Sequence, residues 1–173
     1  MSGKYAIVID TDVVRGATNN AKNRIFRDIL LSFLETEHLL AISTPLWAEW
    51  FKQRDNPAGQ WEYYISLYSY RWLTEMKSRK RVRRYDLDHT LEGRILSGIP
   101  RERTGEVKKD MHLVLTALAA DKRIISNDQR ERRDLQKAGR KFELLCDLVW
   151  PPLEQVCAWL REGAPQKDVF LVC

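Results

Sequence analysis

Four acidic residues of the sequence stand where carboxylates could hold a metal ion. Asp10 ends a short apolar run and Asp128 follows another, while Glu49 and Asp110 come early in segments with helical spacing of apolar residues. Carboxylates suit hard divalent cations such as Mg²⁺ or Mn²⁺, and without a cation a cluster of them repels itself. One or two such ions could activate water and offset the charge of a phosphodiester. Taken singly, each acid also suits an ordinary role, as a turn former, a helix-dipole partner or a surface residue.

The elements that must bring these acids together follow from hydrophobic periodicity. Short apolar runs alternate with longer helical patterns, which predicts an α/β fold with a central parallel sheet of four or five strands. The expected strands are residues 5–10, 39–43, 123–126 and 142–149. Helices are expected at 20–36, from 44, from 61, around 87–95, at 106–121, after 126 and from 151.

The predicted sheet brings the strand-terminal acids to one edge. Asp10 and Asp128 follow parallel strands, and open α/β folds bind ligands at the carboxyl ends of such strands. Asp12 could join them. Asp110 is expected in the first turn of its helix, and the apolar residues Val114 and Ala117, at i+4 and i+7, direct it toward the sheet. A buried ionised carboxylate is disfavoured unless it is paired or binds a metal, so the acids are expected to converge.

The composition indicates one globular domain spanning residues 1–173. The chain is 44% hydrophobic and 31% charged, which is enough for a core without staples. No apolar stretch approaches the roughly 20 residues of a membrane-spanning helix, and the first residues lack a signal-peptide pattern. Three scattered cysteines, Cys146, Cys157 and Cys173, form no C-x-x-C pair and fit a reducing compartment. We therefore expect a cytoplasmic protein that does not engage a membrane.

Positive charge is concentrated in one run. The formal net charge is +5, and the run KSRKRVRR at residues 77–84 contributes six positive charges by itself. A basic patch on a nearly neutral body is typical of polyanion binding, although a solvated helix end has the same composition. Six phosphate contacts would give a salt slope of about −4 on a single strand. The candidate nucleic-acid-binding residues are Lys77, Arg79, Lys80, Arg81, Arg83, Arg84, Lys108 and Arg130.

Aromatic and histidine side chains offer weaker signals. The aromatic residues at helical spacing are Trp61, Tyr64, Tyr68 and Trp72. Such a stripe is more typical of a core or a dimer interface than of a platform on which bases stack. The three histidines, His38, His89 and His112, have no metal-ligand spacing, and His112 is expected to pack or to face solvent beside Asp110. The sequence contains no phosphate-binding glycine motif and no nucleophile elbow.

Several segments, taken in order, resemble the PIN-domain nuclease family. They are VIDTDVV at 8–14, STPLWAEW at 43–50, KKDMHLVLTALAADKRIISND at 108–128 and the closing segment with its proline-led helix. The resemblance spans most of the chain except for an insertion at about 55–90, which is expected to be helical. It implies a three-layer α/β/α fold and metal-dependent endonucleolytic cleavage of single-stranded RNA.

The resemblance also assigns residues to the site. It makes Asp10, Glu49 and Asp110 the core acidic triad and Asp128 the fourth acid, all four as catalytic and metal-binding residues. Ser126 matches the family's small hydroxyl position as a supporting contact. Two other functions stay open, namely a catalytically silent PIN-like module that binds RNA or a protein, and a DNA-directed nuclease of the same fold. A homodimer, a protein partner and the docking of the apolar tail at 169–173 stay open as well.

Overall fold

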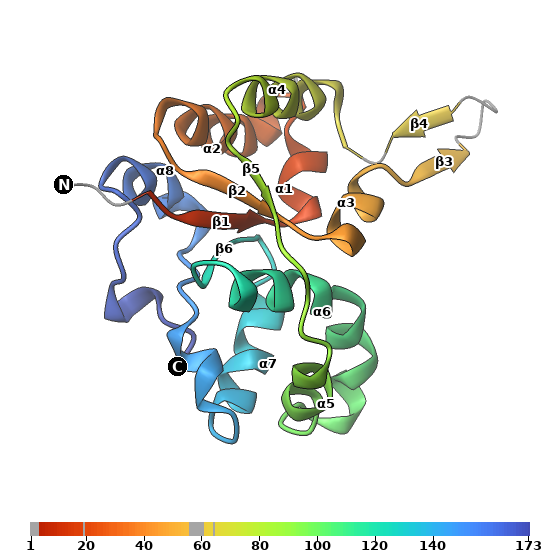
Figure 1. The fold of residues 1–173 in the computed structure, drawn as a ribbon, viewed down its shortest axis with the longest axis vertical. Helices are drawn as coiled ribbons and strands as arrows, with labels where there is room; N and C mark the ends of the chain where they lie inside the picture. The colour runs from red at the N-terminus through yellow and green to blue at the C-terminus, as the bar shows by residue number, and fades with distance from the viewer. Residues whose placement is uncertain (1–3, 19, 56–60, 64) are drawn as a thin grey trace.

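Four short parallel strands form the central sheet of the molecule (Figure 1). The computed structural model describes residues 4–18, 20–55, 61–63 and 65–173. Within them the strands of this sheet lie in the order β5-β2-β1-β6. They are β1 Ala6–Ile9, β2 Leu39–Ile42, β5 Val82–Arg84 and β6 Arg123–Ile125. The predicted α/β class and parallel sheet are confirmed.

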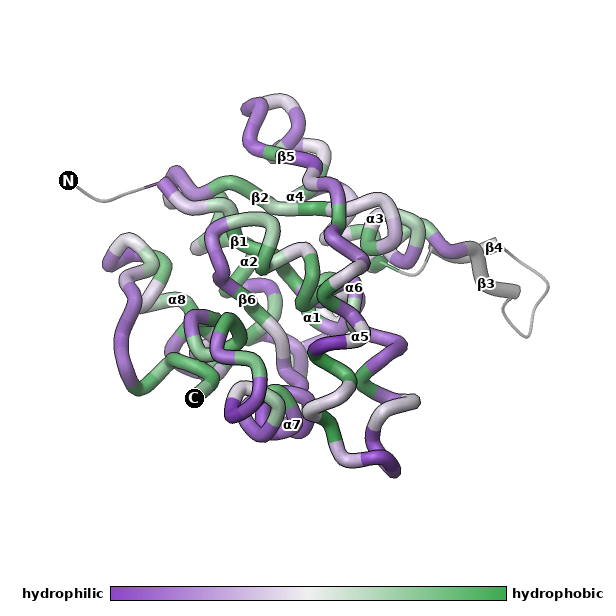
Figure 2. The backbone as a smooth tube through the Cα atoms, turned by 60° about the horizontal axis from the view of Figure 1, so that its bottom comes forward, coloured by the Kyte–Doolittle hydropathy of each residue, from purple (hydrophilic) through white to green (hydrophobic). Residues whose placement is uncertain are grey.

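The central strands are buried on both faces. Every residue of β1 is buried, and only Leu39 of β2 keeps partial exposure. Figure 2 shows both strands as hydrophobic segments of the chain. Because a strand that is apolar on both faces needs cover on both sides, the sheet lies between two layers of helices.

One helix layer packs around α2 and the other around α6 (Figure 1). The first comprises α1 Thr11–Gly16, α2 Arg24–Glu35, α4 Leu67–Ser78 and α8 Leu153–Arg161. The second comprises α5 Thr90–Leu96, α6 Thr104–Ala119 and α7 Gln129–Gly139. The short helix α3 Thr44–Trp50 contacts α1 and α6, and so joins the two layers just beyond β2. Among the described residues, no helix has the length and apolarity that crossing a membrane requires.

The segment before α4 differs from the prediction. Trp61–Tyr63 forms β4, which pairs antiparallel with β3 Gln53–Asp55, so the helix expected from residue 61 was wrong at its start. The helix begins at Leu67, where the Ser66 hydroxyl accepts the Ser69 N–H at 3.1 Å and caps the first turn. Helical spacing in a sequence cannot reveal a strand partner elsewhere in the chain, and here that partner decided the conformation.

The aromatic residues expected on one face of a helix lie in different elements, because Trp61 is in β4 whereas Tyr68 and Trp72 are in α4. Trp72 is buried and packs edge-on against Phe33 with ring centroids 5.9 Å apart, in agreement with the core interpretation. Tyr68 is half-buried on the same helix. The side chain of Trp61 and the whole of Tyr64 lie outside the described residues.

One outer strand of the sheet, β6, was expected, but the other, β5, was not. Inside the basic run, β5 pairs with β2, although its charged residues show no strand pattern. The predicted strand at 142–149 was wrong, because Glu143–Asp147 forms a 3₁₀ helix and only Val149 makes a bridge to β6. The expected helical insertion at 55–90 therefore contains a strand of the main sheet. An edge strand has one unpaired side facing solvent, which is why arginines are tolerated in β5.

The C-terminal tail docks beside this last bridge. Leu171 pairs with Val149, and a disulfide joins Cys146 to Cys173. Gly139, at the end of α7, makes room for the disulfide, because a Cβ there would clash with the Cys173 sulfur. The cysteines, interpreted from the sequence as fitting a reducing compartment, thus include one bonded pair, and Cys157 is free. The pairing spans 27 residues and has no local motif that would have predicted it.

Candidate metal centre

Acidic residues from four elements meet at the carboxyl edge of the sheet. Asp10 directly follows β1, Glu49 lies in α3, Asp110 in α6 and Asp128 at the start of α7. The charges of Glu49 and Asp110 act on Asp10, and those of Glu49 and Asp128 act on Asp110. Asp110 is therefore within electrostatic reach of each of the other three predicted acids. Because α6 begins at Thr104, Asp110 lies in its second turn rather than in the predicted first turn.

Three acids form the tightest group. Carboxylate oxygens of Asp110, Asp128 and Glu131 lie within 4.8 Å of one another. Oδ1 of Asp128 accepts the backbone N–H groups of Arg130 and Glu131 at 2.9 and 2.8 Å, which caps α7 and fixes the carboxylate at the end of the helix. Ligand oxygens around a cation with bonds of about 2.1–2.5 Å can be up to about 4–5 Å apart, so one ion fits among the three.

Glu131 gives the most direct indication that this group binds a cation. Its side chain is 3% exposed, and its Oε1 makes no hydrogen bond to any described group. Burial raises the pKa of Glu131 well above its ordinary value, and the nearby charges of Asp110, Asp10 and Asp128 raise it further. A buried acceptor without a partner costs free energy, which a bound cation would remove. The donor set, all carboxylate oxygen, fits Mg²⁺ or Mn²⁺.

Asp10 is within electrostatic reach of Glu131 in this group and is oriented by Ser126. Burial raises the pKa of Asp10 to about 7, against the opposing effect of the Ser126 hydroxyl, which donates to Oδ2 at 2.6 Å. The charges of Asp12, Asp110 and Glu49 raise this pKa further. The Ser126 oxygen also accepts the backbone N–H of Asp128 at 3.0 Å. Ser126, expected as a supporting contact, thus lies between two of the predicted acids.

Glu49 is paired with a histidine. Oε2 of Glu49 lies 2.7 Å from Nε2 of His112. Burial raises the pKa of Glu49, but the hydrogen bond and charge of His112, together with Thr11 and Arg15, outweigh it, so that this pKa is lowered. For His112, burial lowers the pKa, but the Glu49 carboxylate together with the charges of Asp110 and Asp10 outweighs burial, so that this pKa is raised. His112 packs, which was one of the two expected alternatives, but the crossing of α3 and α6 places its ring opposite the Glu49 carboxylate, a partner that the sequence did not indicate.

Asp12 lies at the margin of the site. Its side chain is half exposed and pairs with Arg15 of the same helix at 2.7 Å. Its charge still acts on Asp10 and Asp110, where it raises both pKa values. Asp12 therefore contributes to the field of the site, while its closest charged contact is on the surface of α1.

Glu131 is the acid that sequence reasoning missed. It stands in the run RERR at 130–133, which reads as a charged helix surface. Leu135 and Ala138, at i+4 and i+7 from it, are both fully buried. The same spacing had directed Asp110 toward the sheet, and applied to Glu131 it would have found the buried face of α7.

The basic run at 77–84 crosses the sheet instead of forming one patch. Arg79 and Lys80 lie beside Lys4, at the amino end of the strands. Arg84 pairs in register with Ile42, at the carboxyl end of β2. Because β5 is parallel to its neighbour, Arg83 and Arg84 lie toward the carboxyl ends of the strands, where the acids gather. Both arginines are exposed.

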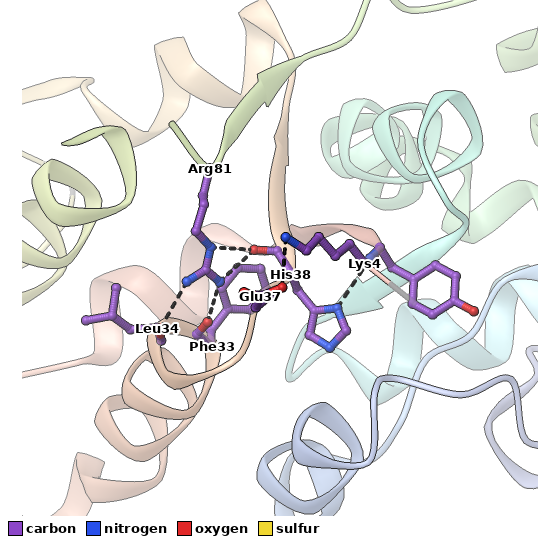
Figure 3. A network of polar contacts seen from close by, with 7 residues as sticks. Lys4, Phe33, Leu34, Glu37, His38 and Arg81 are labelled. Atoms are coloured by element: carbon purple, nitrogen blue, oxygen red, sulfur yellow. Dashed lines mark hydrogen bonds and ion pairs between the residues drawn. The ribbon is translucent and has the colours of Figure 1, made fainter. Parts of the chain in front are cut away.

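Arg81 is engaged by the protein itself. Its guanidinium donates to the backbone carbonyls of Phe33, Leu34 and His38 at 2.6–3.0 Å (Figure 3). These carbonyls belong to the end of α2 and the segment after it, so Arg81 caps the carboxyl end of that helix. Four hydrogen bonds to backbone carbonyls engage this guanidinium, so the run presents fewer than six free charges to a polyanion.

The other candidate cations have varied surroundings. Arg130 is exposed and lines a cavity of about 160 Å³ together with Asp110, Asp128 and Glu131. Nζ of Lys77 lies 4.3 Å from the centre of the Trp47 ring. Ion pairs join Arg79 to Glu75 at 2.7 Å and Lys108 to Glu92 at 3.9 Å. Among these cations, Arg130 is the one that lines the acidic cavity.

Comparisons of the chain with models of protein families, with curated proteins and with solved structures found no match. The fold and the site by themselves define an α/β domain with four parallel strands between helices and an acidic group at the carboxyl edge. Asp110, Asp128 and Glu131 form the part of that group that can hold a metal ion.

Proposed function

We propose that this protein is a divalent-metal-dependent nuclease of the PIN-domain type that cleaves single-stranded RNA endonucleolytically. The observation that carries the proposal is the buried Glu131 carboxylate, which lies beside Asp110 and Asp128. Its Oε1 makes no hydrogen bond to any described group. The resemblance of the segments around Asp10 and Glu49 to that family supports the same assignment. A parallel sheet between helices is the fold that the resemblance implies.

The residues of the site divide the work of binding and orientation. Asp110, Asp128 and Glu131 would hold Mg²⁺ or Mn²⁺, with Asp10 and Glu49 completing the acidic surroundings. A bound ion supplies a Lewis acid that activates water and offsets charge on the phosphate. Arg130, exposed at the cavity, would bind a neighbouring phosphate through its guanidinium.

The choice of single-stranded RNA rests on the resemblance and on the exposed cations near the acidic edge. Arg83 and Arg84 provide positive charge that could follow a nucleic-acid backbone toward the site. Carboxylate-held metals do not distinguish ribose from deoxyribose, so the sugar must be tested directly.

The test is incubation of the purified protein with end-labelled RNA and DNA, single- and double-stranded, in Mn²⁺ or in EDTA. We expect internal cleavage of single-stranded RNA in Mn²⁺ and none in EDTA. Asp110→Asn should lower the cleavage rate by about 100-fold or more. This loss is larger than the one usually caused by removing a hydrogen-bonded partner of a metal ligand. Glu154→Gln, on the exposed face of α8, is the matched control and should retain the rate.

Two other outcomes would replace the proposal. Cleavage of DNA but not of RNA would assign a DNA-directed nuclease. Absence of cleavage together with absence of Mn²⁺ binding in calorimetry would assign a catalytically silent binding module.

A further inference from the structure

The Glu49 carboxylate is held from another helix. Nε2 of His112 in α6 lies 2.7 Å from Oε2 of Glu49 in α3, and the two side chains are only 17% and 31% exposed. Since the carboxylate can only accept, the imidazole Nε2–H is the donor. A partly buried hydrogen bond to a charged acceptor is short and directional, and it restricts the rotamer of Glu49.

The turn of α6 that follows His112 is joined to the start of α3 by a hydrogen bond. One turn after His112, the Thr116 hydroxyl lies 2.8 Å from Oγ of Ser43 and 2.5 Å from the His112 carbonyl oxygen. Ser43 caps α3, accepting the backbone N–H of Leu46. Both Ser43 and Thr116 are fully buried. Two polar contacts therefore join α3 to α6, one at the cap and one at Glu49.

We propose that His112 is a positioning residue, which holds Oε2 of Glu49 and thereby fixes the orientation of this carboxylate beside Asp110, a member of the group that would hold the metal ion. This inference rests on the proposed function for its metal ion, but the His112–Glu49 contact itself does not. Hydrogen-bonded partners of metal ligands fix the orientation of the ligand, and their loss typically weakens metal binding by about 10–100-fold. A purely structural role for His112 would have no reason to depend on Glu49.

A double-mutant cycle on Mn²⁺ affinity, measured by calorimetry on the full chain, separates the two roles. His112→Ala should weaken Mn²⁺ binding by about 10-fold in the wild-type background, and should cause almost no further loss in Glu49→Gln. His112→Gln retains a side-chain N–H near the Nε2 position and should recover most of the affinity. His89→Ala, at an exposed histidine before α5, is the control and should bind like the wild type.

Equal losses from His112→Ala in both backgrounds, or no loss in either, would overturn the positioning role. Long-range ¹H–¹⁵N correlation of the histidine rings reports on the contact without metal. We expect a protonated Nε2 at His112 whose resonance shifts in Glu49→Gln, and an unshifted resonance would overturn the contact. If the wild type binds no Mn²⁺ while the resonance shifts, the contact stands, but the positioning role falls together with the proposed metal centre.

Discussion

The acidic site has two sides, whose carboxylates differ in their hydrogen-bond partners. On the paired side, comprising Asp10 and Glu49, each carboxylate receives a hydrogen bond from a neighbouring side chain, at 2.6 and 2.7 Å respectively. On the open side, comprising Asp110, Asp128 and Glu131, oxygens crowd within 4.8 Å and Oε1 of Glu131 has no partner among the described groups. The difference indicates where a cation is needed, because the protein already orients the first side and leaves acceptors on the second.

The largest expected effect separates the two sides by metal affinity. Glu131→Gln removes a charge from the open side and should weaken Mn²⁺ binding by about 100-fold, whereas Ser126→Ala removes only a partner of the paired side and should cost about 10-fold or less. Calorimetric titration of both variants with Mn²⁺ measures which of them loses more affinity. Near-normal affinity in Glu131→Gln would show that the open side is not the metal site.

The second prediction concerns the paired side without metal. Because the pKa of Asp10 is raised to about 7, the folded protein binds this proton more tightly than the unfolded chain does. The resulting stability is present below the ordinary pKa of 3.8 and is lost as the pH rises through about 7. In EDTA, the free energy of unfolding measured with urea should therefore fall by a few kcal/mol as the pH rises from 3.8 to about 7, at about 1.4 kcal/mol per pKa unit.

Asp10→Asn should remove this part of the pH dependence and stabilise the metal-free protein at pH 8. Asp86→Asn, at an exposed position before α5, serves as the control and should leave the slope of stability against pH as in the wild type. An unchanged slope in Asp10→Asn would mean that Asp10 is charged in the metal-free fold at neutral pH.

The smallest effect concerns the approach to the site from the basic run. Replacing Arg83 and Arg84 together by alanine should reduce the steepness of the salt dependence of RNA binding by about 1.4, at about 0.7 per lost phosphate contact. The pair Arg79 and Lys80, replaced in the same way, lies at the opposite edge of the sheet and should change the slope less. Equal changes for the two pairs would mean that RNA spans both edges.

Local patterns predicted the buried strands of the sheet better than its exposed strand. The strands β1, β2 and β6 could be recognised because short apolar runs are dictated by burial on both faces. The strand β5 could not, because an arginine-rich edge strand is defined by its neighbour β2 and not by its own residues. The apolar run at 142–149 suggested a strand, yet its i to i+3 hydrogen bonds make a 3₁₀ turn from Glu143 to Asp147.

The sequence by itself determined the fold class and the choice of Asp10, Glu49, Asp110 and Asp128 as acids of interest, because periodicity and strand ends are local properties. Only the tertiary structure decided their partners. The crossing of α3 and α6 paired Glu49 with His112, and the buried face of α7 brought Glu131 to Asp110. Hydrogen bonds and charge repulsion act over a few ångströms in space, between residues as much as 116 positions apart in the chain, and no local pattern records such distances.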